Sequence, residues 1–127
     1  MSLTTPADPQ ALVGRWIRLE RDEGRPPHLG LLLRATPIPD HPGLWNWALH
    51  TAQGSVMFGG PHLPAEVLTR KHTNDVARAR RALTRQIRAD RQTRDALIEF
   101  GKPAGVMRHK VDELEQLQES LTAQIHA

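Results

Sequence analysis

The amino-acid sequence predicts an α+β protein in which a small antiparallel β-barrel precedes an antiparallel α-helical hairpin. Two observations support this prediction. The first half of the chain alternates short apolar runs with turn residues, a pattern typical of strands. In the second half, apolar residues recur every three or four positions, which is the period of an amphipathic helix. We expect a disordered arm over residues 1–10, a barrel over residues 11–70 and a hairpin over residues 74–126.

Five short segments of the first half have the composition of strands. The segment 44–51 alternates most clearly, because Trp45, Trp47 and Leu49 fall on one face. The preceding segment 37–43 contains three prolines, each lacking a backbone donor, so we expect a loop there. The last segment suits a strand or a first helical turn, and we favour the strand. The five expected strands lie within residues 11–20, 29–37, 44–51, 55–60 and 65–70.

Three motifs in this half follow one another in an informative order. The run WNWAL at Trp45–Leu49 is followed by GSVMF at Gly54–Phe58 and by PHLPAEV at Pro61–Val67. This order resembles that of SH3-like barrels, in which a tryptophan-bearing strand precedes a glycine turn, an apolar strand, a prolyl one-turn helix and a final strand. The resemblance covers residues 11–70 and implies a small barrel. The chain has no tyrosine with which to line the groove for proline-rich peptides found in such domains.

A first helix is expected from Asn74 or Asp75, either of which can cap its N-terminus. The polar run at 88–95 is either the solvated middle of one long helix or a local break. Gly101 and Pro103 then stop the helix, since glycine suits the C-terminal cap and proline cannot continue it. The short connection that follows favours an antiparallel hairpin.

The second helix carries an apolar seam of the coiled-coil kind, with Gln118 as its one polar position. This seam either packs only on the first helix or also joins two copies of the chain. We expect a homodimer, because two helices alone bury little surface. The predicted dimer interface consists of Met107, Val111, Leu114, Leu117, Leu121 and Ile125.

Charge is concentrated in one segment of the chain. Residues 64–101 carry nine basic and five acidic side chains, although the net charge of the whole chain is only +3. Folding about Pro103 would pair Arg94 with Asp112 and Arg91 with Glu115. Five other arginines have fewer acidic neighbours and form the predicted nucleic-acid-binding set: Arg78, Arg80, Arg81, Arg85 and Arg88.

The function expected from this pattern is a non-enzymatic, nucleic-acid-binding or regulatory protein. The alternative is an adaptor that docks on a protein partner through its barrel or hairpin. Arginine suits either partner, since its planar guanidinium binds both phosphates and carboxylates. A helix face that is merely solvated is the competing explanation.

Several classes of protein are not indicated. The chain has no cysteine, its seven histidines lack metal-ligand spacing, and we expect no metal or cofactor. No phosphate-binding glycine loop or nucleophile elbow is present, and a triad drawn from His50, Ser55 and an aspartate has no motif to support it. The apolar runs are too short to span a membrane, so a cytoplasmic location is expected.

Overall fold

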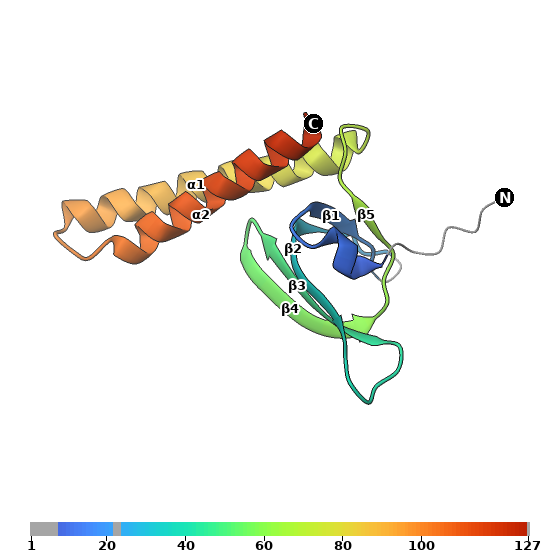
Figure 1. The fold of residues 1–127 in the computed structure, drawn as a ribbon. Helices are drawn as coiled ribbons and strands as arrows, with labels where there is room; N and C mark the ends of the chain where they lie inside the picture. The colour runs from blue at the N-terminus through green and yellow to red at the C-terminus, as the bar shows by residue number, and fades with distance from the viewer. Residues whose placement is uncertain (1–7, 22–23, 127) are drawn as a thin grey trace.

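The computed structural model describes residues 8–21 and 24–126. A single antiparallel sheet is followed by two long helices that lie side by side over it (Figure 1). Residues 1–7 of the predicted arm lie outside the described residues, and the chain then forms a short 3-10 helix, η1. The elements are η1 (Pro9–Leu12), β1 (Trp16–Leu19), β2 (His28–Pro37), β3 (Leu44–Thr51), β4 (Gly54–Pro61), β5 (Ala65–Val67), α1 (Thr73–Glu99) and α2 (Gly105–Ile125).

All five predicted strands are present, in the order β4-β3-β2-β1-β5. The first is shorter than predicted, because η1 occupies part of the expected segment and β1 begins only at Trp16. The predicted closure into a barrel is wrong, since β4 and β5 are the two ends of the sheet in the described chain. The three-residue β5 pairs along β1, and Pro61 and Pro64 flank the turn that separates it from β4.

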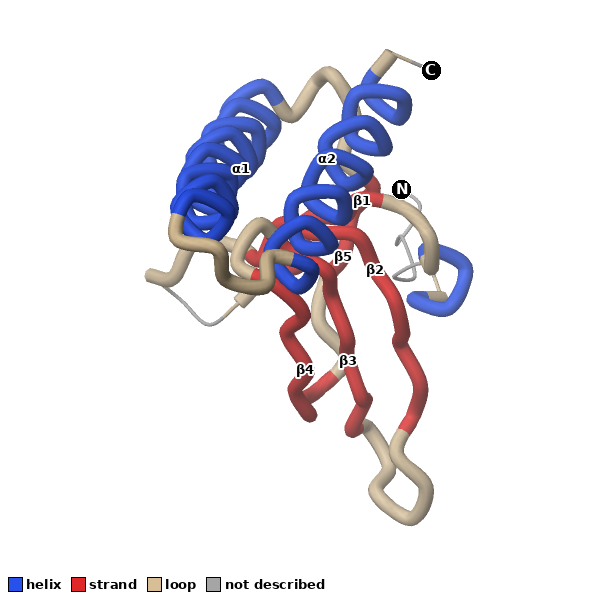
Figure 2. Tube along the Cα trace, turned by 90° about the vertical axis from the view of Figure 1, so that its left-hand side faces the viewer, coloured by secondary structure: helices blue, strands red, loops and turns tan. Residues whose placement is uncertain are grey.

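The sheet is covered on both faces, which explains why neighbouring residues of β1 are both buried. Side chains alternate between faces along a strand, so Trp16 and Ile17 point in opposite directions. Trp16 joins the helices in one apolar cluster, together with Leu68 at the end of the sheet. Ile17 belongs to a second cluster on the other face, with Trp47 at its centre. The helical hairpin therefore contributes to only one of the two cores. Figure 2 shows both helices on the same side of the sheet.

The hairpin confirms the prediction of two antiparallel helices with a glycine stop between them. Gly101 has a φ of 67°, a left-handed conformation that residues other than glycine rarely adopt. Its N–H donates to the carbonyl of Ile98 at 3.0 Å, and the N–H of Lys102 donates to that of Leu97 at 2.8 Å, the paired bonds of a Schellman cap. Residues 88–95 are helical, so α1 is one continuous helix.

Candidate nucleic-acid interface

The arginines of α1 divide between its exposed face and its flanks. The buried face is formed by Val76, Ala79, Leu83 and Ile87. An α-helix turns by about 100° per residue, which places positions 78, 81, 85 and 88 on the opposite side. Arg81, Arg85 and Arg88 are indeed exposed there. These three residues are called the arginine face below.

Arg78 and Arg80 differ from the other predicted site residues. Arg78 donates to the carbonyl oxygen of Pro27 at 3.3 Å and lies 3.6 Å from a carboxylate oxygen of Asp75. Arg80 is half-buried and lies about 100° around the helix from Arg81, outside the arginine face. The predicted set is therefore brought together only in part.

The arginine face has no acidic partner among the described residues, since none of its members forms an ion pair there. Two other arginines of α1 are paired. Arg91 lies 2.7 Å from Glu115, as predicted. The predicted pair of Arg94 with Asp112 is wrong, because Arg94 pairs with Asp95 at 3.1 Å and Asp112 lies on the exposed side of α2. The arginine face is therefore set apart from the paired arginines that follow it along α1.

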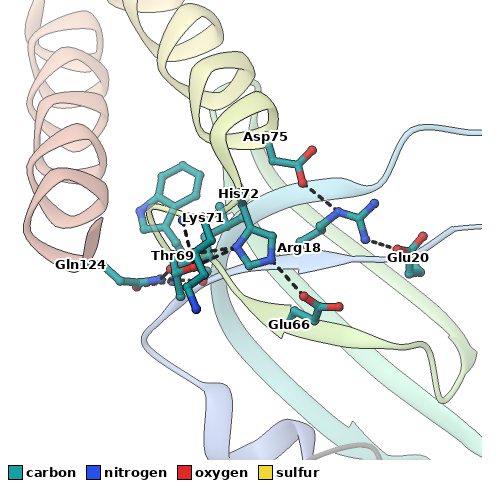
Figure 3. Close-up of polar contacts among 10 residues, drawn as sticks. Arg18, Glu20, Glu66, Thr69, Lys71, His72, Asp75 and Gln124 are labelled. Carbon is teal, nitrogen blue, oxygen red and sulfur yellow. Dashed lines mark hydrogen bonds and ion pairs between the residues drawn. The ribbon is translucent and has the colours of Figure 1, made fainter. Parts of the chain in front are cut away.

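The start of α1 is fixed to the sheet by a group of ion pairs (Figure 3). Arg18 of β1 donates to Asp75 at 2.8 Å and also pairs with Glu20. Partial burial lowers the pKa of Arg18, but the hydrogen bonds and negative charges of Glu20 and Asp75 outweigh it and raise that pKa overall. Asp75 therefore anchors α1 to β1. Because its carboxylate is already engaged by Arg18 and Arg78, it does not neutralise the charge of the arginine face.

The N-terminus of α1 differs from the one predicted. The helix begins at Thr73, and in the described chain His72 occupies the cap position without a side-chain capping bond. The Nδ1 atom of His72 accepts the N–H of Thr69 at 3.1 Å, so its Nε2 carries the proton that faces Glu66 at 2.9 Å. Figure 3 shows this ring between the end of the sheet and the first turn of α1. Asp75 serves the ion pair with Arg18 instead of a cap.

The predicted dimer interface lies mostly inside the single chain. Leu114, Leu117, Leu121 and Ile125 pack with Trp16 in the cluster between the helices and the sheet. Val111 is buried as well, and Met107 is half-buried. Leu117, not Gln118, occupies the inward position of the seam. Leu114, Leu117, Leu121 and Ile125 are thus already buried within one chain, while the homodimer itself stays a prediction.

The triad considered from the sequence is not assembled. His50 and Ser55 are cross-strand partners, and with Asp90 they line a cavity of about 240 Å³ between the β3–β4 turn and the helices. Within the described part of the chain, His50 and Ser55 share no side-chain hydrogen bond, and Asp90 accepts from Gln86 at 3.0 Å. The base and nucleophile of a triad are therefore not in contact.

One group of residues was missed by the sequence reasoning. A cavity of about 220 Å³ lies between the β1–β2 loop and β4, and the rings of His28 and Phe58 stack in its wall with centroids 5.2 Å apart. Burial, followed by the charge of Arg21, lowers the pKa of His28. The segments RPPH and FGGPH flank this cavity, but they are far apart in the chain, and β3 lies between β2 and β4 in the sheet, so no local sequence pattern predicts that they meet.

Comparison with protein-family models, with curated proteins and with solved structures finds no match to this chain. Within residues 8–21 and 24–126, no cluster of histidine, aspartate and glutamate side chains is arranged to hold a metal ion. Neither α1 nor α2, the two long helices in the described residues, is apolar enough to cross a membrane.

Proposed function

We propose that this protein binds nucleic acid, and that the arginine face of α1 contacts the phosphates. The observation that carries the proposal is the row of Arg81, Arg85 and Arg88, exposed and without acidic partners in the described chain. The row spans about 10 Å of helix, given a rise of about 1.5 Å per residue. Guanidinium groups form forked hydrogen bonds with phosphate oxygens, so the row suits a polyanionic backbone.

The energetics of the helix favour a ligand over simple hydration. Like charges three or four positions apart destabilise a helix by about 0.2–0.5 kcal/mol for each pair. Arg81–Arg85 and Arg85–Arg88 are two such pairs. Solvated helix faces commonly mix both signs of charge. Of the four acidic residues of α1, Asp75 pairs with Arg18, Asp90 is buried, Asp95 pairs with Arg94 and Glu99 is the last residue of the helix, so none forms an ion pair with the arginine face in the described chain. A bound polyanion would offset the repulsion that the helix retains.

Replacement of the three arginines by glutamine tests the proposal. Glutamine is a good helix former, so the fold should persist and can be checked by circular dichroism. Removal of one phosphate contact should reduce the affinity about fivefold at about 0.1 M salt, and removal of three should reduce it about 100-fold. The matched control replaces three exposed arginines elsewhere and removes the same net charge: Arg15→Gln, Arg34→Gln and Arg108→Gln. An equal decrease in both variants would reject a specific face.

The second candidate function is a protein-interaction adaptor, favoured by the apolar tip of the hairpin. Phe100 and Val106 are each 74% exposed, and Ile98 beside them is 47% exposed. Figure 1 shows this end of the hairpin far from the strands. Exposed apolar side chains of this size are typical of surfaces that dock in an apolar groove of a partner protein.

A photoreactive phenylalanine analogue at position 100 tests the adaptor. Cross-linking to one protein of defined mass, abolished by Val106→Ser, would support docking through the tip. A chain that cross-links to nothing but still binds nucleic acid through its arginine face would leave only the first proposal.

A further inference from the structure

The cavity beside β4 has the chemistry of a stacking site. Its wall contains the stacked rings of His28 and Phe58, and the guanidinium groups of Arg21 and Arg25 also line it. Gly59 and Gly60 line it too, so this stretch of β4 brings backbone without side chains to the cavity. Aromatic rings and guanidinium planes both stack on flat, unsaturated groups. The cavity is smaller than sites for drug-sized molecules, which occupy about 300–1,000 Å³.

We propose that this cavity takes one unpaired base of a single-stranded nucleic acid whose phosphates run along the arginine face. This inference rests on the proposed function and adds the class of nucleic acid. Phe58 and His28 supply the stacking surface, and Arg25 lies at the same cavity. Any base can stack in this way, so little sequence preference is expected.

The two parts of the surface are physically connected. Arg78 lies one helical turn before Arg81 on the same side of α1. Its side chain donates to the carbonyl of Pro27. Pro27 directly precedes His28, and His28 lines both the base cavity and a cavity of about 290 Å³ that Arg78 also lines. A strand that leaves Arg81 could therefore pass Arg78 and the loop at Pro27 to the base cavity, because His28 is shared by the two cavities.

The cavity differs from the arginine face of α1 because it offers aromatic rings for stacking and no excess of positive charge. The sequence between β1 and β2 contains three acidic residues, Glu20, Asp22 and Glu23, and two basic residues, Arg21 and Arg25, so this segment carries no excess of positive charge. We therefore expect the arginine face of α1 to bind the phosphates and the cavity to bind the base. A base within a duplex is paired and stacked on its neighbours, so it cannot enter such a site without being flipped out.

The test compares two probes of equal charge: an oligothymidylate, and a strand of the same length and backbone that lacks bases. The wild-type protein should bind the oligothymidylate about 5- to 150-fold more tightly, the range expected for the stacking of one base. Phe58→Leu keeps an apolar side chain but removes the ring, and it should make the two affinities equal. Arg25→Lys keeps the positive charge but removes the planar guanidinium group, so it should reduce the difference in affinity between the two probes. Met57→Leu, on the same strand but 78% exposed, is the matched control.

The outcomes separate this inference from the proposed function. If the wild-type protein binds neither probe, the proposed function fails and the inference fails with it. Equal affinity for the two probes, with binding still dependent on the arginine face, overturns the base site alone. The base site is also overturned if Phe58→Leu folds and keeps the full preference for bases, or if a duplex binds more tightly than the oligothymidylate. Should Phe58→Leu not fold, the wild-type comparison of the two probes still decides.

Discussion

The side chain of Gln124 hydrogen-bonds to both backbone polar groups of Trp16. Its Oε1 accepts the N–H of Trp16 at 2.8 Å, and its Nε2 donates to the Trp16 carbonyl at 2.8 Å and to that of Leu68 at 2.9 Å. Ser120, one turn earlier in α2, accepts the indole N–H of Trp16 at 2.9 Å. The last two turns of α2 are thereby fixed to β1, which sets the position of the hairpin on the sheet.

Gln124→Ala should therefore lower the free energy of unfolding by about 2–3 kcal/mol, because it leaves backbone groups of Trp16 and Leu68 without their partner. Urea unfolding measures this change. Gln116→Ala is the control, since Gln116 is exposed on the same helix and should change stability by less than about 0.5 kcal/mol. Equal effects would mean that the amide contributes no more than helix propensity.

Trp47 and Trp45 should respond differently to truncation. Trp47 is 1% exposed, at the centre of the second core, and its indole donates to the carbonyl of Pro61 at 3.3 Å. Trp47→Ala should cost about 3–5 kcal/mol, as truncation of a buried aromatic side chain does. Trp45→Ala should cost clearly less, because Trp45 is only half-buried. Thermal unfolding of both variants provides the comparison, and similar costs would contradict the assigned burial.

Leu121→Ala tests whether the seam of α2 is an internal core or a dimer interface. Leu121 is fully buried within one chain, so the variant should be destabilised by about 2–5 kcal/mol. Its mass by light scattering should equal that of the wild type across a range of concentrations. A wild-type dimer that becomes a folded monomer in this variant would restore the predicted interface.

His28 should make stability depend on pH. Its pKa is lowered in the folded protein by burial and by Arg21, whereas in the unfolded chain it is about 6.5. The unfolded chain therefore binds a proton that the folded chain does not, and stability falls as the pH falls below about 6.5. His28→Phe keeps a ring beside Phe58 but cannot be protonated, so its curve of unfolding free energy against pH should be flatter. Parallel curves for variant and wild type would exclude this role.

Much of the fold follows from local sequence patterns. The alternation around Trp45 and Trp47 located β3, and the pair Gly101 and Pro103 located the turn of the hairpin, because each signal acts over a few residues. Closure of the sheet was not predictable in this way. A barrel closes only if the two edge strands, β4 and β5, pair with each other. No short sequence motif predicts pairing between strands that far apart in the sheet.

The candidate site, like the fold, was predictable where the signal is local and not where it depends on contacts between distant segments. Helical spacing alone placed Arg81, Arg85 and Arg88 on one face. The same spacing did not predict that Asp75 would form an ion pair with Arg18, nor that the leucines of α2 would pack against the sheet. These contacts join segments far apart in the chain, so they follow from the packing of the hairpin on the sheet and not from its period.

The salt dependence of nucleic-acid binding tests the central claim most directly. The logarithm of the affinity of the wild-type protein for an oligothymidylate should fall linearly with the logarithm of the salt concentration. The variant with glutamine at 81, 85 and 88 should show a slope shallower by about 2, since each phosphate that a protein neutralises on a single strand contributes about 0.7. The charge-matched variant at 15, 34 and 108 should keep the wild-type slope. No measurable binding by the wild type, or an identical slope in all three proteins, would contradict the assignment of phosphate contacts to the arginine face.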